Sequence, residues 1–171
     1  MKPALELADG LESYSISGVL FGNLVFWTQV LLGSVASWLV WRWLAAIYLA
    51  YAIVGWLALR RSVCSRCYYR GKRCCMGWGL LLGSSKQDEH WRSFPDSAGI
   101  RLAPFFYGGL SFVPLVLLIY LLVAHFSLVA VVVLAAMVVL GGVSFAMRSA
   151  NCRRCRMRSI CPGAAVKSEA A

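Results

Sequence analysis

The sequence predicts an all-α integral membrane protein, with four transmembrane helices and a small Cys-rich cytoplasmic region that binds a metal. Three observations carry this prediction: 60% of the 171 residues are hydrophobic, the mean hydropathy is +0.70, and the long apolar runs hold almost no charge. Soluble domains are about 45–50% apolar, and a helix that crosses a bilayer needs about 20 apolar residues. The hydrophobic excess therefore indicates helices in lipid rather than a larger soluble core.

The N-terminal tail, residues 1–14, is acidic. It carries Glu6, Asp9 and Glu12 against a single Lys2, which differs from the basic start of a signal peptide. Its leucines are spaced to line one side of a short interfacial helix, and a loosely ordered tail is the alternative.

A first transmembrane hairpin is expected over residues 15–59. Residues 18–59 form an apolar run of 42 residues with a single charge, which is long enough for two crossings. One crossing plus a helix lying in the interface is the alternative. Gly33 and Ser34 offer a turn, so we expect helices over about residues 15–32 and 40–59, with the turn at the outer surface.

Three tryptophans crowd around the only arginine of this run, and two further arginines end the second span. Tryptophan concentrates at bilayer interfaces, and a long arginine side chain reaches from there toward the headgroups. The residues assigned to the lipid headgroups or interface are Arg42, Trp38, Trp41, Trp43, Arg60 and Arg61.

A Cys-rich basic loop is expected over residues 60–101, a second transmembrane hairpin over residues 102–147 and a Cys-rich basic tail over residues 148–171. Pro104 suits the first turn of the third helix, and His125 marks a tight turn within the hairpin.

The last helix contains the spacing Gly142-x3-Ala146. Small residues at this spacing let two helices approach closely in a membrane. An oligomer formed through the last helix is therefore a candidate assembly.

All seven cysteines lie in two patches with similar spacing. The first, called the loop patch, reads Cys-x2-Cys-x6-Cys with one adjacent thiol, and the second, called the tail patch, reads Cys-x2-Cys-x5-Cys. The loop patch consists of Cys64, Cys67, Cys74 and Cys75, and the tail patch of Cys152, Cys155 and Cys161.

Both patches are expected on the same face of the membrane, because two adjacent spans return the chain to the side it left. Of the 17 Lys and Arg residues, 15 fall in the two segments on that face, and the exceptions are Lys2 and Arg42. The positive-inside rule then predicts that the patches are cytoplasmic, and we expect the plasma membrane of a prokaryote.

Thiols in the cytosol stay reduced, so a Cys-x-x-Cys pair there indicates a metal site or a redox site. Two pairs supply four thiolates, the count for structural zinc or for an iron–sulfur cluster. Nearby basic residues are expected to lower the pKa of the thiols and so favour ligation. The candidate metal ligands are Cys64, Cys67, Cys74, Cys152, Cys155 and Cys161, with Cys75 as an extra ligand or thiol.

These features favour a metal-containing adaptor or accessory subunit of a membrane complex, whose partners are the lipid bilayer and another membrane or cytoplasmic protein. The alternatives are a membrane redox protein that uses an iron–sulfur cluster or a dithiol, and lipidation of the juxtamembrane cysteines. The net charge of +10 sits beside apolar spans, where topology and anionic lipid explain it, so nucleic acid is not an expected partner. No catalytic motif emerges from the sequence.

Overall fold

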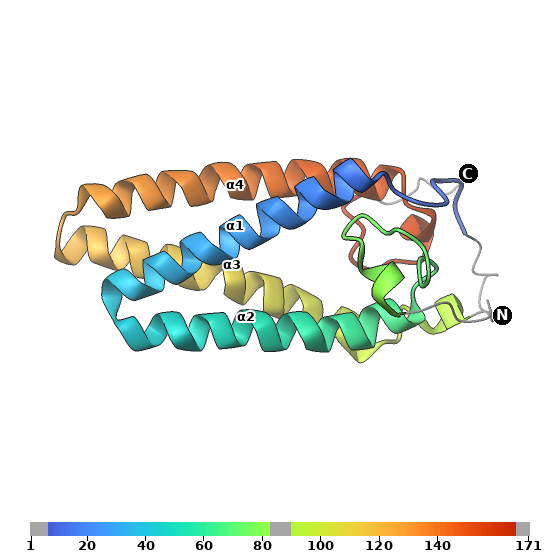
Figure 1. The fold of residues 1–171 in the computed structure, drawn as a ribbon, viewed down its shortest axis with the longest axis horizontal. Helices are drawn as coiled ribbons and strands as arrows, with labels where there is room; N and C mark the ends of the chain where they lie inside the picture. The colour runs from blue at the N-terminus through green and yellow to red at the C-terminus, as the bar shows by residue number, and fades with distance from the viewer. Residues whose placement is uncertain (1–6, 83–89, 167–171) are drawn as a thin grey trace.

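Four long helices lie side by side in an elongated bundle (Figure 1). The computed structural model describes residues 7–82 and 90–166, and within these residues the chain forms no strand. Each of the four helices is long and apolar enough to cross a membrane, which confirms the predicted all-α architecture. The helices are α1 (Ile16–Val40), α2 (Arg42–Val63), α3 (Ala98–Ala124) and α4 (Leu128–Arg153).

The two ends of the bundle differ in their connections (Figure 1). Trp41 alone joins α1 to α2, and residues 125–127 join α3 to α4, so both tight turns lie at one end. At the opposite end the chain forms short 3-10 helices around the cysteines. These are η1 (Cys64–Arg66), η2 (Trp78–Leu82), η3 (His90–Ser93) and η4 (Arg156–Ser159).

The predicted turn at Gly33 and Ser34 was wrong, because α1 continues through both residues to Val40. Inside the bundle the Ser34 hydroxyl donates to the Val30 carbonyl at 2.9 Å, so its hydrogen bond is formed within α1. Gly33 is needed for packing instead, since an added Cβ would collide with the Tyr48 ring of α2. The chain breaks at Trp41, whose backbone is extended with φ −164° and ψ 129°.

The second hairpin starts earlier and ends later than the sequence suggested. The helix α3 begins at Ala98 rather than at residue 102, so Pro104 lies inside the helix and not in its first turn. The helix α4 extends to Arg153 rather than ending at residue 147, so Cys152 lies in its last turn. The turn at His125 lies where it was predicted.

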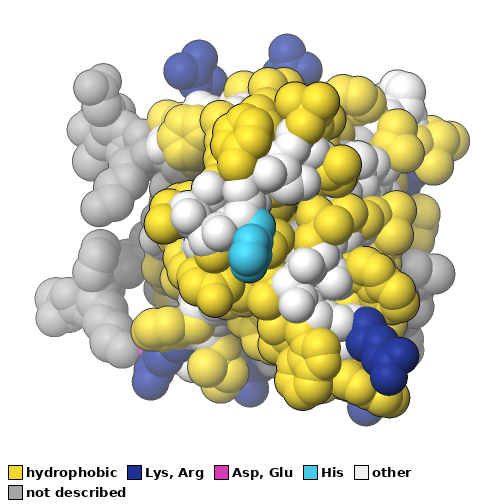
Figure 2. All heavy atoms as spheres, turned by 90° about the vertical axis from the view of Figure 1, so that its left-hand side faces the viewer, with side chains coloured by type: hydrophobic (Ala, Val, Ile, Leu, Met, Phe, Trp, Pro, Cys, Tyr) yellow, Lys and Arg dark blue, Asp and Glu magenta, His cyan; other side chains and the backbone are white. Residues whose placement is uncertain are grey.

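The helices pack through two apolar clusters. One joins α1, α2 and α3 around Val30, Tyr48 and Phe106. The other joins α1, α3 and α4 around Ala36, Leu118 and Met137. Many large apolar side chains remain outside these clusters; Val123, for example, is 84% exposed. Hydrophobic side chains also cover most of the end that carries the tight turns (Figure 2). Such a surface suits a lipid environment.

Candidate functional site

The structure brings the two cysteine patches together at one end of the bundle. A buried cluster of Tyr14, Tyr69, Phe94 and Met157 forms the centre of this end. Cysteines from both patches pack against it, namely Cys67, Cys74 and Cys75 of the loop patch and Cys155 and Cys161 of the tail patch. The two patches, which were expected on the same face of the membrane, therefore meet at one end of the bundle, and all seven thiols are free.

The loop patch begins directly after α2 with a tight turn. The Cys67 N–H donates to the Cys64 carbonyl at 3.3 Å, and the Arg70 N–H donates to the Cys67 carbonyl at 3.1 Å. Cys67 itself is extended, with φ −92° and ψ 144°. These bonds fold the first Cys-x-x-Cys pair back on itself, so both sulfurs stay near the end of α2.

The tail patch repeats this geometry at the end of α4. The Cys155 N–H donates to the Cys152 carbonyl at 3.2 Å, and the Arg158 N–H donates to the Cys155 carbonyl at 3.2 Å. Cys155 is extended, with φ −84° and ψ 131°. Each half of the protein is thus a helical hairpin that ends in the same cysteine turn.

Backbone N–H groups also point at sulfur atoms in both turns. The Tyr69 N–H donates to the Cys67 sulfur, and the Met157 N–H donates in the same way to the Cys155 sulfur. The Gly163 N–H donates to Cys161. Such bonds favour the charged thiolate form, which is the form that binds metals.

Burial outweighs these bonds and raises the pKa of Cys67, Cys155 and Cys161. Burial also raises the pKa of Cys75 to about 12, with further contributions from Cys74, Cys155 and Cys152. Basic residues do lower the pKa of two thiols as expected, Arg60 that of Cys64 and Arg148 that of Cys161, but burial outweighs both effects.

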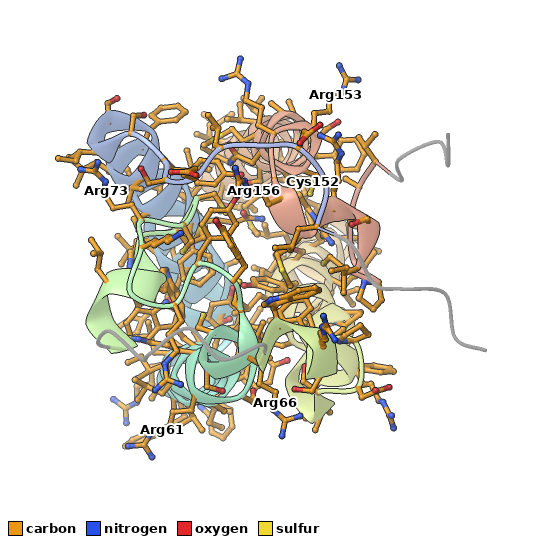
Figure 3. All side chains as sticks on the ribbon, turned by 90° about the vertical axis from the view of Figure 1, so that its right-hand side faces the viewer. Arg61, Arg66, Arg73, Cys152, Arg153 and Arg156 are labelled. Carbon is orange, nitrogen blue, oxygen red and sulfur yellow. The ribbon has the colours of Figure 1, made fainter. Side chains whose placement is uncertain are left out.

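The positions of most arginines explain why their effect on the pKa of the thiols is small. Arg61, Arg66, Arg73 and Arg153 lie around the rim of this end, whereas Arg156 lies nearer its middle (Figure 3). Charges at the rim are screened by water, so they compensate little for the desolvation of a buried thiolate.

The adjacent cysteines Cys74 and Cys75 differ in their electrostatic neighbours. The charge of Cys74 acts on Cys64 and Cys67 of its own patch. Cys75 instead has Cys152 and Cys155 of the tail patch among its electrostatic neighbours. Cys75, expected from the sequence only as an extra thiol, is therefore a contact between the patches.

Residues 7–14, called the N-terminal segment, tie the two patches together. The Ala8 N–H donates to the Arg156 carbonyl at 3.0 Å, and the Leu11 N–H donates to the Arg154 carbonyl at 2.9 Å. The Tyr14 N–H donates to the Arg73 carbonyl of the loop patch region at 2.9 Å. Over residues 7–14, both expectations for the N-terminal tail, an interfacial helix and a loose tail, were wrong; residues 1–6 of that tail lie outside the described residues.

Two tyrosines of this region surround the Cys155 sulfur, which lies within hydrogen-bonding reach of both hydroxyls. The Tyr14 hydroxyl donates to the Asn151 carbonyl at 3.0 Å, and the Tyr69 hydroxyl donates to the Leu11 carbonyl at 2.8 Å. The sequence offered no signal for this arrangement, because the tyrosines come from distant segments.

Arg156 fastens the N-terminal segment with its side chain. Its Nε donates to the Gly10 carbonyl at 3.1 Å, and its guanidinium also reaches the Tyr68 hydroxyl at 3.0 Å and Glu12 at 3.4 Å. Through these contacts Arg156 belongs to the cysteine site rather than to the basic rim.

A metal centre is not preformed. Among the described residues, no group of three or more His, Cys, Asp or Glu side chains is arranged to hold a metal ion. The donor chemistry nevertheless fits a thiophilic metal, because sulfur atoms from two patches meet and backbone N–H groups already point at three of them.

The expected interfacial residues lie at both ends of the bundle. Trp38, Trp41 and Trp43 are all more than half exposed around the α1–α2 turn, where the Arg42 guanidinium lies 5.6 Å from the centre of the Trp43 ring. At the cysteine end, the Arg60 guanidinium lies 5.5 Å from the Trp56 ring and 5.9 Å from the Trp78 ring. Arg61 is exposed beside it.

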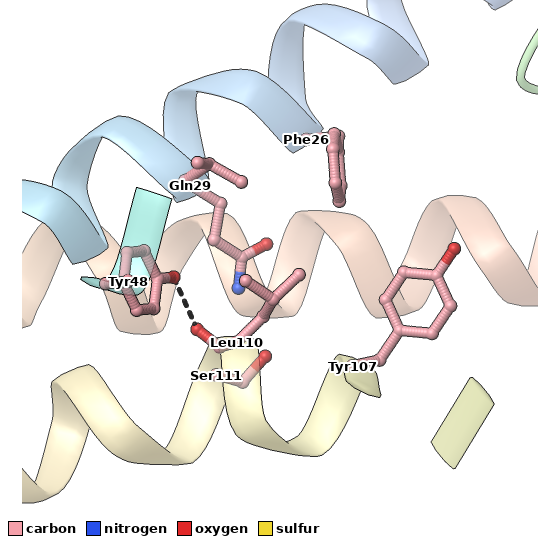
Figure 4. Close-up of a pocket in the computed structure, with 7 residues that line it drawn as sticks. Phe26, Gln29, Tyr48, Tyr107, Leu110 and Ser111 are labelled. Carbon is pink, nitrogen blue, oxygen red and sulfur yellow. Dashed lines mark hydrogen bonds between the residues drawn. The ribbon is translucent and has the colours of Figure 1, made fainter. Parts of the chain in front are cut away.

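A small cavity lies inside the bundle between α1, α2 and α3 (Figure 4). The Tyr48 hydroxyl donates to the Leu110 carbonyl at 2.8 Å beside it, and Gln29 accepts from the Ser144 hydroxyl at 3.3 Å. Its volume of about 30 Å³ suits a single water molecule. Pockets for organic ligands measure about 300–1,000 Å³, so this cavity is too small for one.

Fold and site together define a class: a four-helix protein of membrane-spanning dimensions with a half-buried cysteine cluster at one end. Comparisons with protein families, curated proteins and solved structures found no match to this chain. The cysteine end is the part of the molecule whose chemistry points to a function.

Proposed function

We propose that this is a small integral membrane protein that binds zinc or an iron–sulfur cluster through its cysteines and serves as an adaptor or accessory subunit of a membrane complex. The observation that carries the proposal is the repeated cysteine turn. Two turns with the same backbone hydrogen bonds, and the same N–H donor to the second sulfur, meet at one end of the bundle.

The metal would act as a clamp between the ends of α2 and α4. These helices end in the two cysteine turns, and each belongs to a different hairpin. Structural zinc sites contribute about 10–16 kcal/mol in small domains, whereas a polar contact between membrane helices contributes about 1 kcal/mol. A closed thiolate site would therefore dominate how the two hairpins are held together.

The partners follow from the surfaces. The exposed apolar sides of the helices would contact the lipid bilayer, and the basic rim would place the cysteine end in the cytoplasm of a prokaryotic cell by the positive-inside rule. A second membrane or cytoplasmic protein would dock on this end. The last helix could add self-association, since Cβ atoms added at Gly141 or Gly142 would meet no other atom within 4 Å.

Metal analysis of anaerobically purified protein tests the proposal. The wild-type protein should contain zinc or iron in a fixed ratio to the chain, and Cys67→Ser and Cys155→Ser should each lose it. The double variant should be scarcely worse than either single variant, because both changes break one unit. The control Ser65→Ala alters the same turn without removing a sulfur. Full metal content in Cys155→Ser would overturn the proposal.

The alternative is a membrane redox protein that uses an iron–sulfur cluster or a dithiol. It is favoured by the position of Cys75 near Cys152 and Cys155, which makes a thiol pair between the patches available. Iron with visible absorbance would support this alternative, and zinc would support the adaptor.

A further inference from the structure

The N-terminal segment lies directly against the backbone of the tail patch. Leu11 and Cys155 form an isolated parallel β-bridge, and the Leu11 N–H donates to the Arg154 carbonyl at 2.9 Å. The two stretches of chain lie so close together that a Cβ added to Gly10 would come within 2.6 Å of the Arg154 carbonyl oxygen and 3.1 Å of the Cys155 carbonyl carbon. The segment therefore covers Cys155 on the side of its backbone.

Tyr14 covers the same cysteine with its side chain. It is 7% exposed, and its hydroxyl lies within hydrogen-bonding reach of the Cys155 sulfur. Cys75 of the loop patch is also among its electrostatic neighbours. The N-terminal segment thus lies where the two patches meet, and a small molecule that approaches Cys155 from this side meets the segment first.

Much of the N-terminal segment is held only weakly. Four of its other side chains are exposed, namely Asp9, Leu11, Glu12 and Ser13. Glu12, which pairs with Arg156, is 75% exposed. Exposed ion pairs contribute little to stability, and a stretch with few buried apolar contacts opens locally far more often than a packed helix does. The segment is therefore suited to open while the helices stay packed.

We propose that the N-terminal segment is a lid on the cysteine site, which opens while the four-helix bundle stays folded and so controls how fast ions and thiol reagents reach Cys155. Arg156 holds the segment closed, because its Nε donates to the Gly10 carbonyl and its guanidinium pairs with Glu12. This role goes beyond the proposed function, since it concerns access to the thiols and applies to any ion that binds them.

Thiol labelling of the metal-free, full-length protein in detergent tests this inference. Under anaerobic conditions the protein is exposed to a maleimide, and mass spectrometry of its peptides follows each cysteine separately. Arg156→Gln removes the contacts to Gly10 and Glu12 and should raise the labelling rate of Cys155 by about threefold or more. Arg153→Gln is the matched control, because it removes the same charge from an exposed arginine of the rim (Figure 3). It should change the labelling rate by less than about twofold.

Gly10→Ala opens the segment in a second way, because the added methyl group would strike the backbone at Arg154. It should raise the labelling rate of Cys155 by about tenfold or more, since a clash with backbone atoms is relieved only when the segment moves away. Ser13→Ala changes an exposed side chain of the same segment and should leave the rate within about twofold.

Cys64 is the internal control, because the neighbours that shift its pKa lie outside the N-terminal segment. Faster labelling of Cys155 in Arg156→Gln and Gly10→Ala, with an unchanged rate at Cys64, supports the inference. An unchanged rate at Cys155 in either variant, or an equal acceleration at Cys64, overturns it. If Gly10→Ala does not fold, Arg156→Gln decides alone. None of these results depends on metal content, so the thiolate site of the proposed function stands or fails separately.

Discussion

Cys75 shows how burial and charge compete at a single residue. Its side chain is half-buried, and desolvation raises its pKa from 9.0 to about 12. Neighbouring thiols add to the shift, because several negative charges in one place repel each other. Without a metal cation, this cysteine therefore stays protonated at neutral pH.

This shift predicts how the metal-free protein responds to alkali. A folded-state pKa above the unfolded value contributes stability that is fully present below the unfolded pKa and is lost as the pH rises through the folded pKa. The Tm of the metal-free protein should therefore stay level up to about pH 8 and fall between pH 9.0 and about 12. Thermal unfolding in detergent across this range measures it.

Cys75→Ala is the control for this titration. Tyrosines and lysines titrate in both proteins, so the difference between the two curves reports on Cys75. The variant should show the shallower fall, and parallel curves would contradict the assignment of the shift to this thiol.

At the level of single residues, the sequence predicted which cysteines meet but not their chemistry. The repeated Cys-x-x-Cys spacing and the topology were enough to place Cys67 and Cys155 at one end. The direction of the pKa shift depends on where the arginine side chains point, and the sequence does not contain that information. The roles of Tyr14 and Met157 were missed for the same reason.

At the level of the helices, Gly33 is needed for packing between two helices, whereas Gly141 is not. Gly33 is buried where α1 crosses Tyr48 of α2, and an added Cβ would strike the Tyr48 ring. Gly141 of α4 has open space around it, with no atom within 4 Å of an added Cβ. The same substitution should therefore have opposite effects at the two positions.

Gly33→Ala should lower the free energy of unfolding by about 1–3 kcal/mol, since Tyr48 must move and give up its hydrogen bond to Leu110. Gly141→Ala should leave the free energy of unfolding unchanged or raise it by up to about 1 kcal/mol, because alanine restricts the unfolded chain. Denaturation in mixed micelles measures both. A loss of stability in the monomeric Gly141→Ala protein as large as that in Gly33→Ala would refute this account of the packing.

Helix existence followed from the sequence, whereas helix ends did not. Long apolar runs are sufficient to predict four spans. A Gly-Ser pair, however, need not end a helix when a side chain of a neighbouring helix packs against the glycine. Here Tyr48 occupies the space that Gly33 leaves, so the helix continues and the break moves to Trp41. The same limit applies to Pro104, which the extended start of α3 places inside the helix.

At the scale of the whole molecule, charge is divided between the two ends. Apolar side chains dominate the end with the tight turns, and arginines surround the cysteine end (Figures 2 and 3). This polarity is what the positive-inside rule requires of a protein with four crossings.

Reporter fusions test this topology. Fusions after Trp41 and after His125 should report outside, and fusions after Asp96 and at the C-terminus should report inside, because Trp41 and His125 lie at the turns opposite the cysteine end. The C-terminal fusion retains all four helices and serves as the control for insertion. An inside signal after Trp41 would reduce the protein to three crossings.

The bond between Arg156 and Gly10 spans 146 positions of the chain. Residues 7–14 are synthesised before residues 154–156, with which they form these bonds. Synthesis at about 5–20 residues per second separates the two by roughly 7–30 s. The cysteine end therefore stays open while the four helices are being made, and it closes only once residues 154–156, which follow α4, have been added. An ion bound between the two patches would therefore arrive after the last helix has been made, not before it.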